Sequence, residues 1–146
     1  MNRPRRGFAI ACLVALAATG CANTAGPPEV DYNQPATLSS IPGSSVNKVT
    51  LTALAAQQLG IQTQPVAAAK AKGETVIPLT ALVYGPDGDA WAYANVAPLT
   101  YVRQPLVIDH IDQNTVVLRS GPGLGTPVVT IGGQELLGTE YGVGEE

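Results

Sequence analysis

The sequence predicts a small, mostly β domain, built as an antiparallel β-roll or barrel with one short helix. From residue 78 to residue 133, runs rich in Val, Ile, Tyr and Thr are separated by short Gly, Pro, Asp and Asn breaks, which is typical of an antiparallel meander. The chain has 146 residues, enough for one domain. It is 45% hydrophobic and only 13% charged, so its composition favours a folded core over a disordered chain.

The first twenty residues have the pattern of a signal peptide. A basic end is followed by an apolar run over residues 8–18, which is too short to span a bilayer as a helix, and by small residues before Cys21. Residues 16–21 resemble a bacterial lipobox, in which the cysteine sulfur receives a diacylglyceryl group and cleavage then makes that cysteine the first residue. The pair Arg5 and Arg6 also resembles a twin-arginine export signal.

These signals predict an exported protein held at a membrane by lipid on Cys21. Two acyl chains anchor a protein stably, whereas one is marginal. We expect the chain on the outer face of the cytoplasmic membrane, on its periplasmic or extracellular side. The alternative is ordinary secretion, which would leave Cys21 as a free thiol.

Charge and cysteine content limit the classes of partner. Without the signal peptide, five basic residues face eleven carboxylates, a net charge of −6. An acidic surface argues against nucleic acid as a partner and against a polybasic grip on anionic lipid. The other cysteine, Cys12, lies inside the signal peptide, so we expect neither a disulfide nor a thiol nucleophile in the mature chain.

The chain divides into four predicted parts. Residues 1–20 are the signal peptide, and residues 21–45, which are rich in Pro, Gly and Ser and lack apolar periodicity, are predicted as a lipidated, flexible tether. Residues 46–144 are predicted as a single β domain, and residues 145–146 as an acidic tail.

The β domain is predicted to begin with a strand, a short helix and a second strand. Residues 46–51 form the first strand, and Thr52 is a typical N-cap for a helix that runs to residue 58 and stops at Gly60. The side chains of residues 61–66 are expected to alternate between two faces, which predicts the second strand. Residues 67–73 favour a helical connection. One side of the helix is predicted to present Leu51, Leu54, Ala55 and Leu59.

The meander follows, and the strands of residues 46–66 are expected to pair with it. A hairpin turn is predicted at residues 85–88, after which Trp91 and Tyr93 share one strand face, opposite a row of alanines. Because Pro105 has no N–H, the strand that contains it is expected to be bulged or at an edge. Residues 134–137 are predicted as a helical turn. The strands are predicted at residues 75–79, 81–84, 99–111, 115–119 and 128–131.

The residue inventory argues against an enzyme. The chain has one histidine and none of the sequence motifs of serine hydrolases, zinc proteases or dithiol oxidoreductases, so we predict no catalytic residue, no metal and no cofactor. His110 is a single imidazole, and neighbouring Asp109 is expected on the opposite strand face. Asp87 and Asp89 lack the spacing of a calcium loop and are interpreted as parts of a tight turn.

Aromatic residues near the hairpin suggest a contact surface, because Trp and Tyr are enriched at protein interfaces. The alternative is that they fill the half-buried side of the sheet. We expect a partner to use the hairpin of residues 85–93 and an edge formed by residues 99–111. The candidate contact residues are Asp87, Trp91, Tyr93, Tyr101 and Arg103.

Several segments, in this order, resemble the C-terminal part of periplasmic adaptor subunits of RND-type efflux pumps, the membrane fusion proteins. They are P-L-T-A-L-V at residues 78–83, G-D-A-W-A-Y at 88–93, V-R-Q-P-L-V at 102–107 and G-L-G-T-P-V-V-T-I-G at 123–132. V-T-L-T at residues 49–52 and L-G-I-Q-T-Q-P-V at 59–66 resemble a segment near the N-terminus of those adaptors. A full adaptor carries a lipoyl-like domain, a helical hairpin and a β-barrel between the two parts, whereas a short linker joins them here.

The resemblance implies the membrane-proximal β domain of an adaptor, in which the two flanking parts come together. It implies a non-enzymatic accessory of transmembrane transport that contacts an inner-membrane efflux transporter or another envelope protein. The alternative is a stand-alone extracytoplasmic binding module for a small molecule or a cell-wall component.

Overall fold

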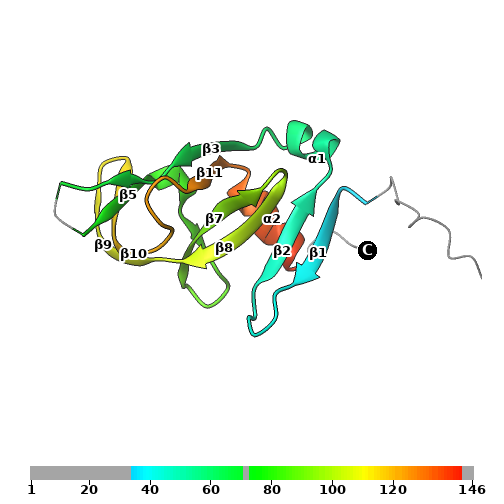
Figure 1. The fold of residues 1–146 in the computed structure, drawn as a ribbon, viewed down its shortest axis with the longest axis horizontal. Helices are drawn as coiled ribbons and strands as arrows, with labels where there is room; N and C mark the ends of the chain where they lie inside the picture. Colours follow the sequence, from blue (N-terminus) through cyan, green and yellow to red (C-terminus); the bar gives the residue numbers. More distant parts are fainter. Residues whose placement is uncertain (1–33, 71–72, 143–146) are drawn as a thin grey trace, which may run out of the picture. The chain divides into compact units, whose positions relative to one another are not determined.

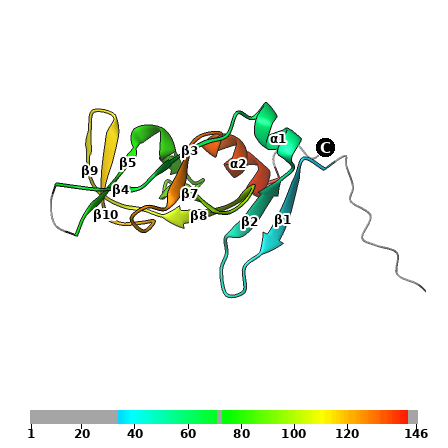
Figure 2. The same ribbon diagram turned by 45° about the horizontal axis from the view of Figure 1, so that its top comes forward.

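The computed structural model describes residues 34–70 and 73–142, and within them the chain is mostly β, as predicted. It contains two antiparallel sheets and two α-helices (Figures 1 and 2). Neither helix is long and apolar enough to cross a bilayer in these ranges. The larger sheet contains β1 (Ala36–Ser40), β2 (Asn47–Leu51), β3 (Gln62–Pro65), β6 (Val83–Tyr84), β7 (Ala90–Ala97), β8 (Thr100–Pro105) and β11 (Pro127–Ile131). The smaller sheet contains β4 (Ala67–Ala68), β5 (Thr75–Pro78), β9 (Val107–Asp112) and β10 (Thr115–Ser120).

The strands that precede the meander pair with it, as predicted. β2 pairs with β8, placing Val49 opposite Tyr101, and β3 pairs with β11, placing Gln64 opposite Val128. The larger sheet has the order β1-β2-β8-β7-β11-β3, with β6 attached to β7, so it is open and does not close into a barrel. The early and late parts of the sequence therefore share one sheet (Figure 1).

Helix α1 (Ala53–Gln58) confirms the predicted cap and stop. Thr52 has an extended backbone, and its Oγ1 accepts a 3.1 Å hydrogen bond from the N–H of Ala55, which satisfies a free helical donor. Gly60 ends the helix at φ +62°, a conformation that favours glycine. The predicted apolar side is wrong at Leu54, which is 63% exposed, because a helix of six residues buries only the side that carries Ala55.

The predicted tether is wrong for part of its length. Residues 36–40 form β1, which pairs with β2 along its whole length, and the N–H of Thr52 donates to the carbonyl of Pro35 at 2.9 Å. β1 is an edge strand with mostly exposed side chains, and backbone pairing holds it in the sheet. Because it has no buried side, its sequence does not sustain to its end the alternation between apolar and polar residues, which is the pattern that predicts a strand. Residues 21–33 lie outside the described residues.

Two other connections also differ from the prediction. Residues 67–68 form β4, which pairs with β5, so the expected helical connection begins as a strand, because sheet pairing overrides the helix propensity of alanine. Residues 79–81 form the short 3₁₀ helix η1 (Leu79–Ala81) where the chain leaves β5.

The long strand predicted over residues 99–111 is two strands in two sheets. β8 ends at Pro105, which lies opposite Trp91, and β9 begins at Val107. Between them the N–H of buried Leu106 donates to the carbonyl of Ala90 at 2.9 Å. β8 lies between β2 and β7, so this half of the predicted edge is inside the larger sheet. Of the two strands, only β9 is an edge strand, and it belongs to the smaller sheet.

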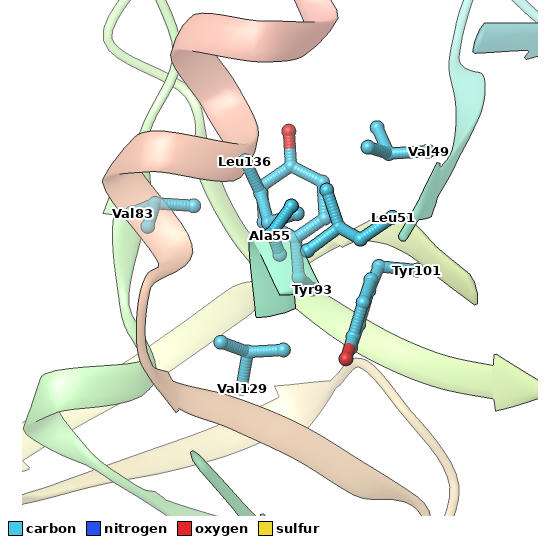
Figure 3. Close-up of a cluster of buried hydrophobic side chains, with 8 residues drawn as sticks. All are labelled: Val49, Leu51, Ala55, Val83, Tyr93, Tyr101, Val129 and Leu136. Atoms are coloured by element: carbon cyan, nitrogen blue, oxygen red, sulfur yellow. The ribbon is translucent and has the colours of Figure 1, made fainter. Parts of the chain in front are cut away.

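Two clusters of buried side chains form the core. The first lies around Tyr93, whose ring is at the centre of the close-up in Figure 3, and consists of Val49, Leu51, Ala55, Val83, Tyr93, Tyr101, Val129 and Leu136. The second lies on the other face of β7 and consists of Val66, Ile77, Ala81, Ala92, Leu106, Val116, Leu118 and Val128. Tyr93 and Ala92 belong to different clusters, which confirms the predicted alternation along this strand.

Helix α2 (Gly133–Glu140) is longer than the helical turn predicted at residues 134–137, so the described residues contain two helices where one was expected. Fully buried Leu136 packs α2 into the first cluster. Gly138 and Thr139 are weak helix formers, which is why propensity underestimated the helix.

Candidate functional site

The face of the β7–β8 ribbon that meets α2 carries the aromatic residues singled out in the sequence. Tyr93 lies directly opposite Arg103 in the antiparallel pairing, and Trp91 is two residues before Tyr93 on the same strand face. Side chains that are opposite or diagonal on one face of paired strands come within contact distance. The register therefore brings Trp91, Tyr93 and Arg103 together.

A buried carboxylate at the end of α2 joins these strands. Glu140 accepts hydrogen bonds from the Tyr93 hydroxyl at 2.6 Å, from Arg103 Nε at 3.0 Å and from the backbone N–H of Asn47 at 3.0 Å. Arg103 Nε lies 3.0 Å from the second carboxylate oxygen as well. A carboxylate at the last residue of a helix is disfavoured by the helix dipole, and burial adds a desolvation cost. The three donors offset these costs and fix α2 against β2, β7 and β8.

The protonation of this group follows from its surroundings. Burial, and then the hydrogen bond to Glu140, raise the pKa of Tyr93, so its hydroxyl remains a donor. For Arg103, burial alone would lower the pKa, but the hydrogen bond and the charge of Glu140 outweigh it, and the pKa of Arg103 is raised. The arginine therefore stays charged although only 8% of it is exposed.

The guanidinium of Arg103 is also flanked by aromatic rings. Its Cζ lies 4.5 Å from the ring centroid of Trp91 and 5.1 Å from that of Tyr141, within the range of cation–π attraction. Nε is engaged by Glu140, whereas Nη1 and Nη2 make no hydrogen bond within the described ranges. No fully buried side-chain nitrogen or oxygen of the described part lacks a partner, so the Nη groups reach an open space.

That space is a pocket of about 480 Å³ between the β6–β7 hairpin turn and the end of α2. The turn is closed by hydrogen bonds from the N–H of Gly85 to the carbonyl of Asp89 and from the N–H of Gly88 to the carbonyl of Gly85, which confirms the predicted turn. The pocket is lined by Ser45, Gly85, Pro86, Asp87, Asp89, Trp91, Arg103 and Tyr141.

A second hollow of about 420 Å³ shares Gly85, Pro86 and Tyr141 with the pocket. Its remaining lining comes from Tyr84 at the start of the hairpin and from residues of α2. Tyr84 and Tyr141 are 53% and 47% exposed, so aromatic surface is available beside the pocket.

The five predicted contact residues do not form one surface. Asp87, Trp91 and Arg103 line the pocket together. Tyr93 and Tyr101 are 0% and 4% exposed in the first core cluster, so the prediction that they contact a partner is wrong. α2 covers their face of the sheet, and the sequence had suggested only one turn of that helix.

Sequence reasoning missed Glu140 and Tyr141. Glu140 lies four residues after buried Leu136 and therefore on the same side of α2. A longer predicted helix would have drawn attention to a carboxylate on its buried side.

The lone histidine belongs to a different cluster, on β9 and β10. Asp109 Oδ2 lies 2.7 Å from His110 Nδ1, and Asp109 Oδ1 accepts from Arg119 Nε at 2.6 Å. The hydrogen bonds of His110, and then of Arg119, lower the pKa of Asp109. The expectation that Asp109 and His110 point apart is wrong, because the pairing with β10 skips Asp109 at a bulge, which redirects its side chain. Within the described ranges, no group of three metal-ligating residues occurs.

Comparisons of the chain with protein-family models, with curated proteins and with solved structures find no match. Functional inference therefore depends on the residues and the geometry described above.

Proposed function

We propose that this chain is a lipid-anchored, non-enzymatic extracytoplasmic domain that contacts an envelope protein, with an inner-membrane efflux transporter as the candidate partner. The observation that carries the proposal is the pairing of β2 with β8 and of β3 with β11. It joins in one sheet the two parts of the sequence that resemble the ends of an RND adaptor. In such adaptors these parts build the membrane-proximal domain.

The surface around the hairpin supports a protein contact. The turn presents exposed Asp87, and behind it lie Trp91, Arg103 and two partly exposed tyrosines. Aromatic residues and arginine are the types enriched at protein interfaces. The anchoring part of the proposal depends on Cys21, which lies outside the described residues, and the non-enzymatic part depends on the residue inventory.

Deletion of the gene in its own host tests the proposal. We expect greater sensitivity to compounds that the partner pump exports, restored by the wild-type chain but not by Cys21→Ala or Asp87→Lys. Leu54→Lys is the matched control, because Leu54 is exposed on α1 and does not line the pocket. Unchanged sensitivity to every pump-exported compound would contradict the transporter contact.

A second candidate function is a binding module for a small molecule or a cell-wall component. The observation that favours it is the pocket itself, whose volume of about 480 Å³ is within the usual range for small-molecule sites. Saturable binding of a small ligand to the purified chain distinguishes this function from the first.

A further inference from the structure

We propose that the pocket between the β6–β7 turn and Tyr141 binds a small zwitterion of the amino-acid or dipeptide class, with its carboxylate on Arg103 and its ammonium group on Asp87 and Asp89. This inference rests on the second candidate function and does not depend on contact with a transporter. Its basis is the arrangement of three charged groups around one pocket of about 480 Å³.

The carboxylate end is assigned to Arg103. This side chain is 92% shielded from solvent, and Glu140 and Trp91 hold it in place through Nε and through the ring face. Arg103 lines the pocket, and its two Nη groups have no hydrogen-bond partner in the described ranges. A guanidinium presents two parallel N–H donors along its terminal edge, which match the two oxygens of a carboxylate. Because the fork is held in position before binding, little conformational entropy is lost.

The ammonium end is assigned to the hairpin turn. Asp87 and Asp89 line the same pocket, and neither forms an ion pair with another described residue. Arg103 and Glu140 compensate each other, so these two carboxylates leave the site with negative charge. That charge disfavours a purely anionic ligand, and a purely cationic ligand would leave the Nη donors unused. A ligand that carries both groups pairs with both ends of the pocket.

The walls set the size and character of the ligand. Pro86 and the rings of Trp91 and Tyr141 supply apolar surface to the same pocket. Small-molecule sites typically combine such walls with a few polar groups that fix orientation. A dipeptide with small side chains carries this combination of groups and can be accommodated in a pocket of about 480 Å³.

Trp91 provides the readout, because it is the only tryptophan in the chain and lines the pocket. The full chain, purified in detergent, is titrated with the dipeptide Ala-Ala while the emission of Trp91 is recorded. N-acetyl-Ala-Ala, which lacks the ammonium group, and Ala-Ala amide, which lacks the carboxylate, are the matched probes. We expect saturable binding of Ala-Ala, and at least tenfold weaker binding of each capped form.

Variants assign the two ends. Asp87→Asn combined with Asp89→Asn should weaken the binding of Ala-Ala at least tenfold. The same variant should not weaken the binding of the N-acetyl form, whose carboxylate no longer meets the negative charge of the turn. Arg103→Lys keeps a cation beside Glu140 but removes the two parallel N–H donors of the guanidinium. It should therefore weaken the binding of both Ala-Ala and the N-acetyl form. If circular dichroism shows that Arg103→Lys is unfolded, the test depends on two other comparisons. These are the double variant of Asp87 and Asp89 against the wild type, and Ala-Ala against its two capped forms.

Two results would overturn the inference. One is the absence of a saturable change in emission with folded wild-type chain, and the other is equal affinity for Ala-Ala and its capped forms. Either result leaves the proposed contact with a transporter untouched, since that contact is read from pump-dependent sensitivity.

Discussion

Tyr93 and Glu140 are 47 positions apart in the sequence, yet the hydroxyl of Tyr93 donates a 2.6 Å hydrogen bond to Glu140 Oε2 in the protein interior. Arg103, opposite Tyr93 on the neighbouring strand, donates from Nε to Glu140 Oε1. Together these two hydrogen bonds hold the end of α2 on the sheet. The bond from Arg103 also fixes the position of one residue that lines the candidate pocket. Stability and site geometry are therefore linked through one carboxylate.

Replacing Glu140 with Gln should be strongly destabilising. The change leaves the buried guanidinium of Arg103 without its counter-charge, and breaking a buried ion pair in this way costs about 3–5 kcal/mol. The free energy of unfolding, measured by urea denaturation, should fall by that amount. Glu135→Gln is the matched control, because Glu135 is exposed on the same helix and should change stability by no more than about 0.5 kcal/mol. Equal effects of the two substitutions would contradict the assigned role of Glu140.

Removing only the hydroxyl of Tyr93 should cost less. A hydrogen bond to a charged group contributes about 1.5–3 kcal/mol, so Tyr93→Phe should lower the unfolding free energy by this amount. The loss should be smaller when Glu140 is already Gln, which a double-mutant cycle measures. Tyr84→Phe, at a tyrosine that is 53% exposed, should be close to neutral. A purely additive cycle would show that the two residues do not interact.

Stability should fall at alkaline pH. The pKa of folded Tyr93 is raised above its ordinary value of 10.0, first by burial and then by the hydrogen bond to Glu140. The unfolded chain ionises at the ordinary pKa, so this contribution to stability is complete below pH 10 and is lost as the pH rises toward the raised pKa. Between those values one tyrosine contributes a slope of about 1.4 kcal/mol per pH unit.

Burial also raises the pKa of Tyr101, so this tyrosine contributes to the loss of stability at alkaline pH as well. Comparing the wild type with Tyr93→Phe isolates the part of that loss that is due to Tyr93. The unfolding free energy of this variant should decline less steeply above pH 10 than that of the wild type. Parallel curves would show that Tyr93 ionises alike in the folded and unfolded chain.

The start of α2 requires glycine. Gly132 has φ +94°, and a Cβ at this position would overlap Cδ1 of Ile61. Gly132→Ala should therefore destabilise the protein by about 1–3 kcal/mol. Gly138→Ala is the opposite case, because nothing lies within 4 Å of its added Cβ and alanine is favoured inside a helix by about 0.5–1 kcal/mol. Thermal unfolding should show the two variants on opposite sides of the wild type.

Local signals in the sequence predicted much of this fold. Thr52 and the turn at residues 85–88 act on their immediate neighbours, and the alternation of Trp91 and Tyr93 with alanines needs only one strand. The edge strand β1 was missed because backbone pairing holds it without a buried side. Propensity likewise underestimated α2, because packing of Leu136 stabilises it.

The candidate site was only partly predictable for the same reason. The aromatic pattern pointed to Trp91, and the expected edge at residues 99–111 included Arg103. The contact of Arg103 with Glu140, however, spans 37 positions and depends on how α2 crosses the sheet. No local pattern reports such a contact. Predicting which aromatic residues are exposed therefore required the position of the helix.

The most direct test of the proposed contact is photo-crosslinking in living cells, from a probe that replaces Asp87 at the exposed hairpin turn while Cys21 is kept. A second probe at exposed Leu54 on α1 serves as the matched control, and captured proteins are identified by mass spectrometry. We predict that the probe at position 87 captures an inner-membrane transporter and that the probe at position 54 does not. If probes along the turn and along β9 capture no membrane protein, the transporter contact is contradicted.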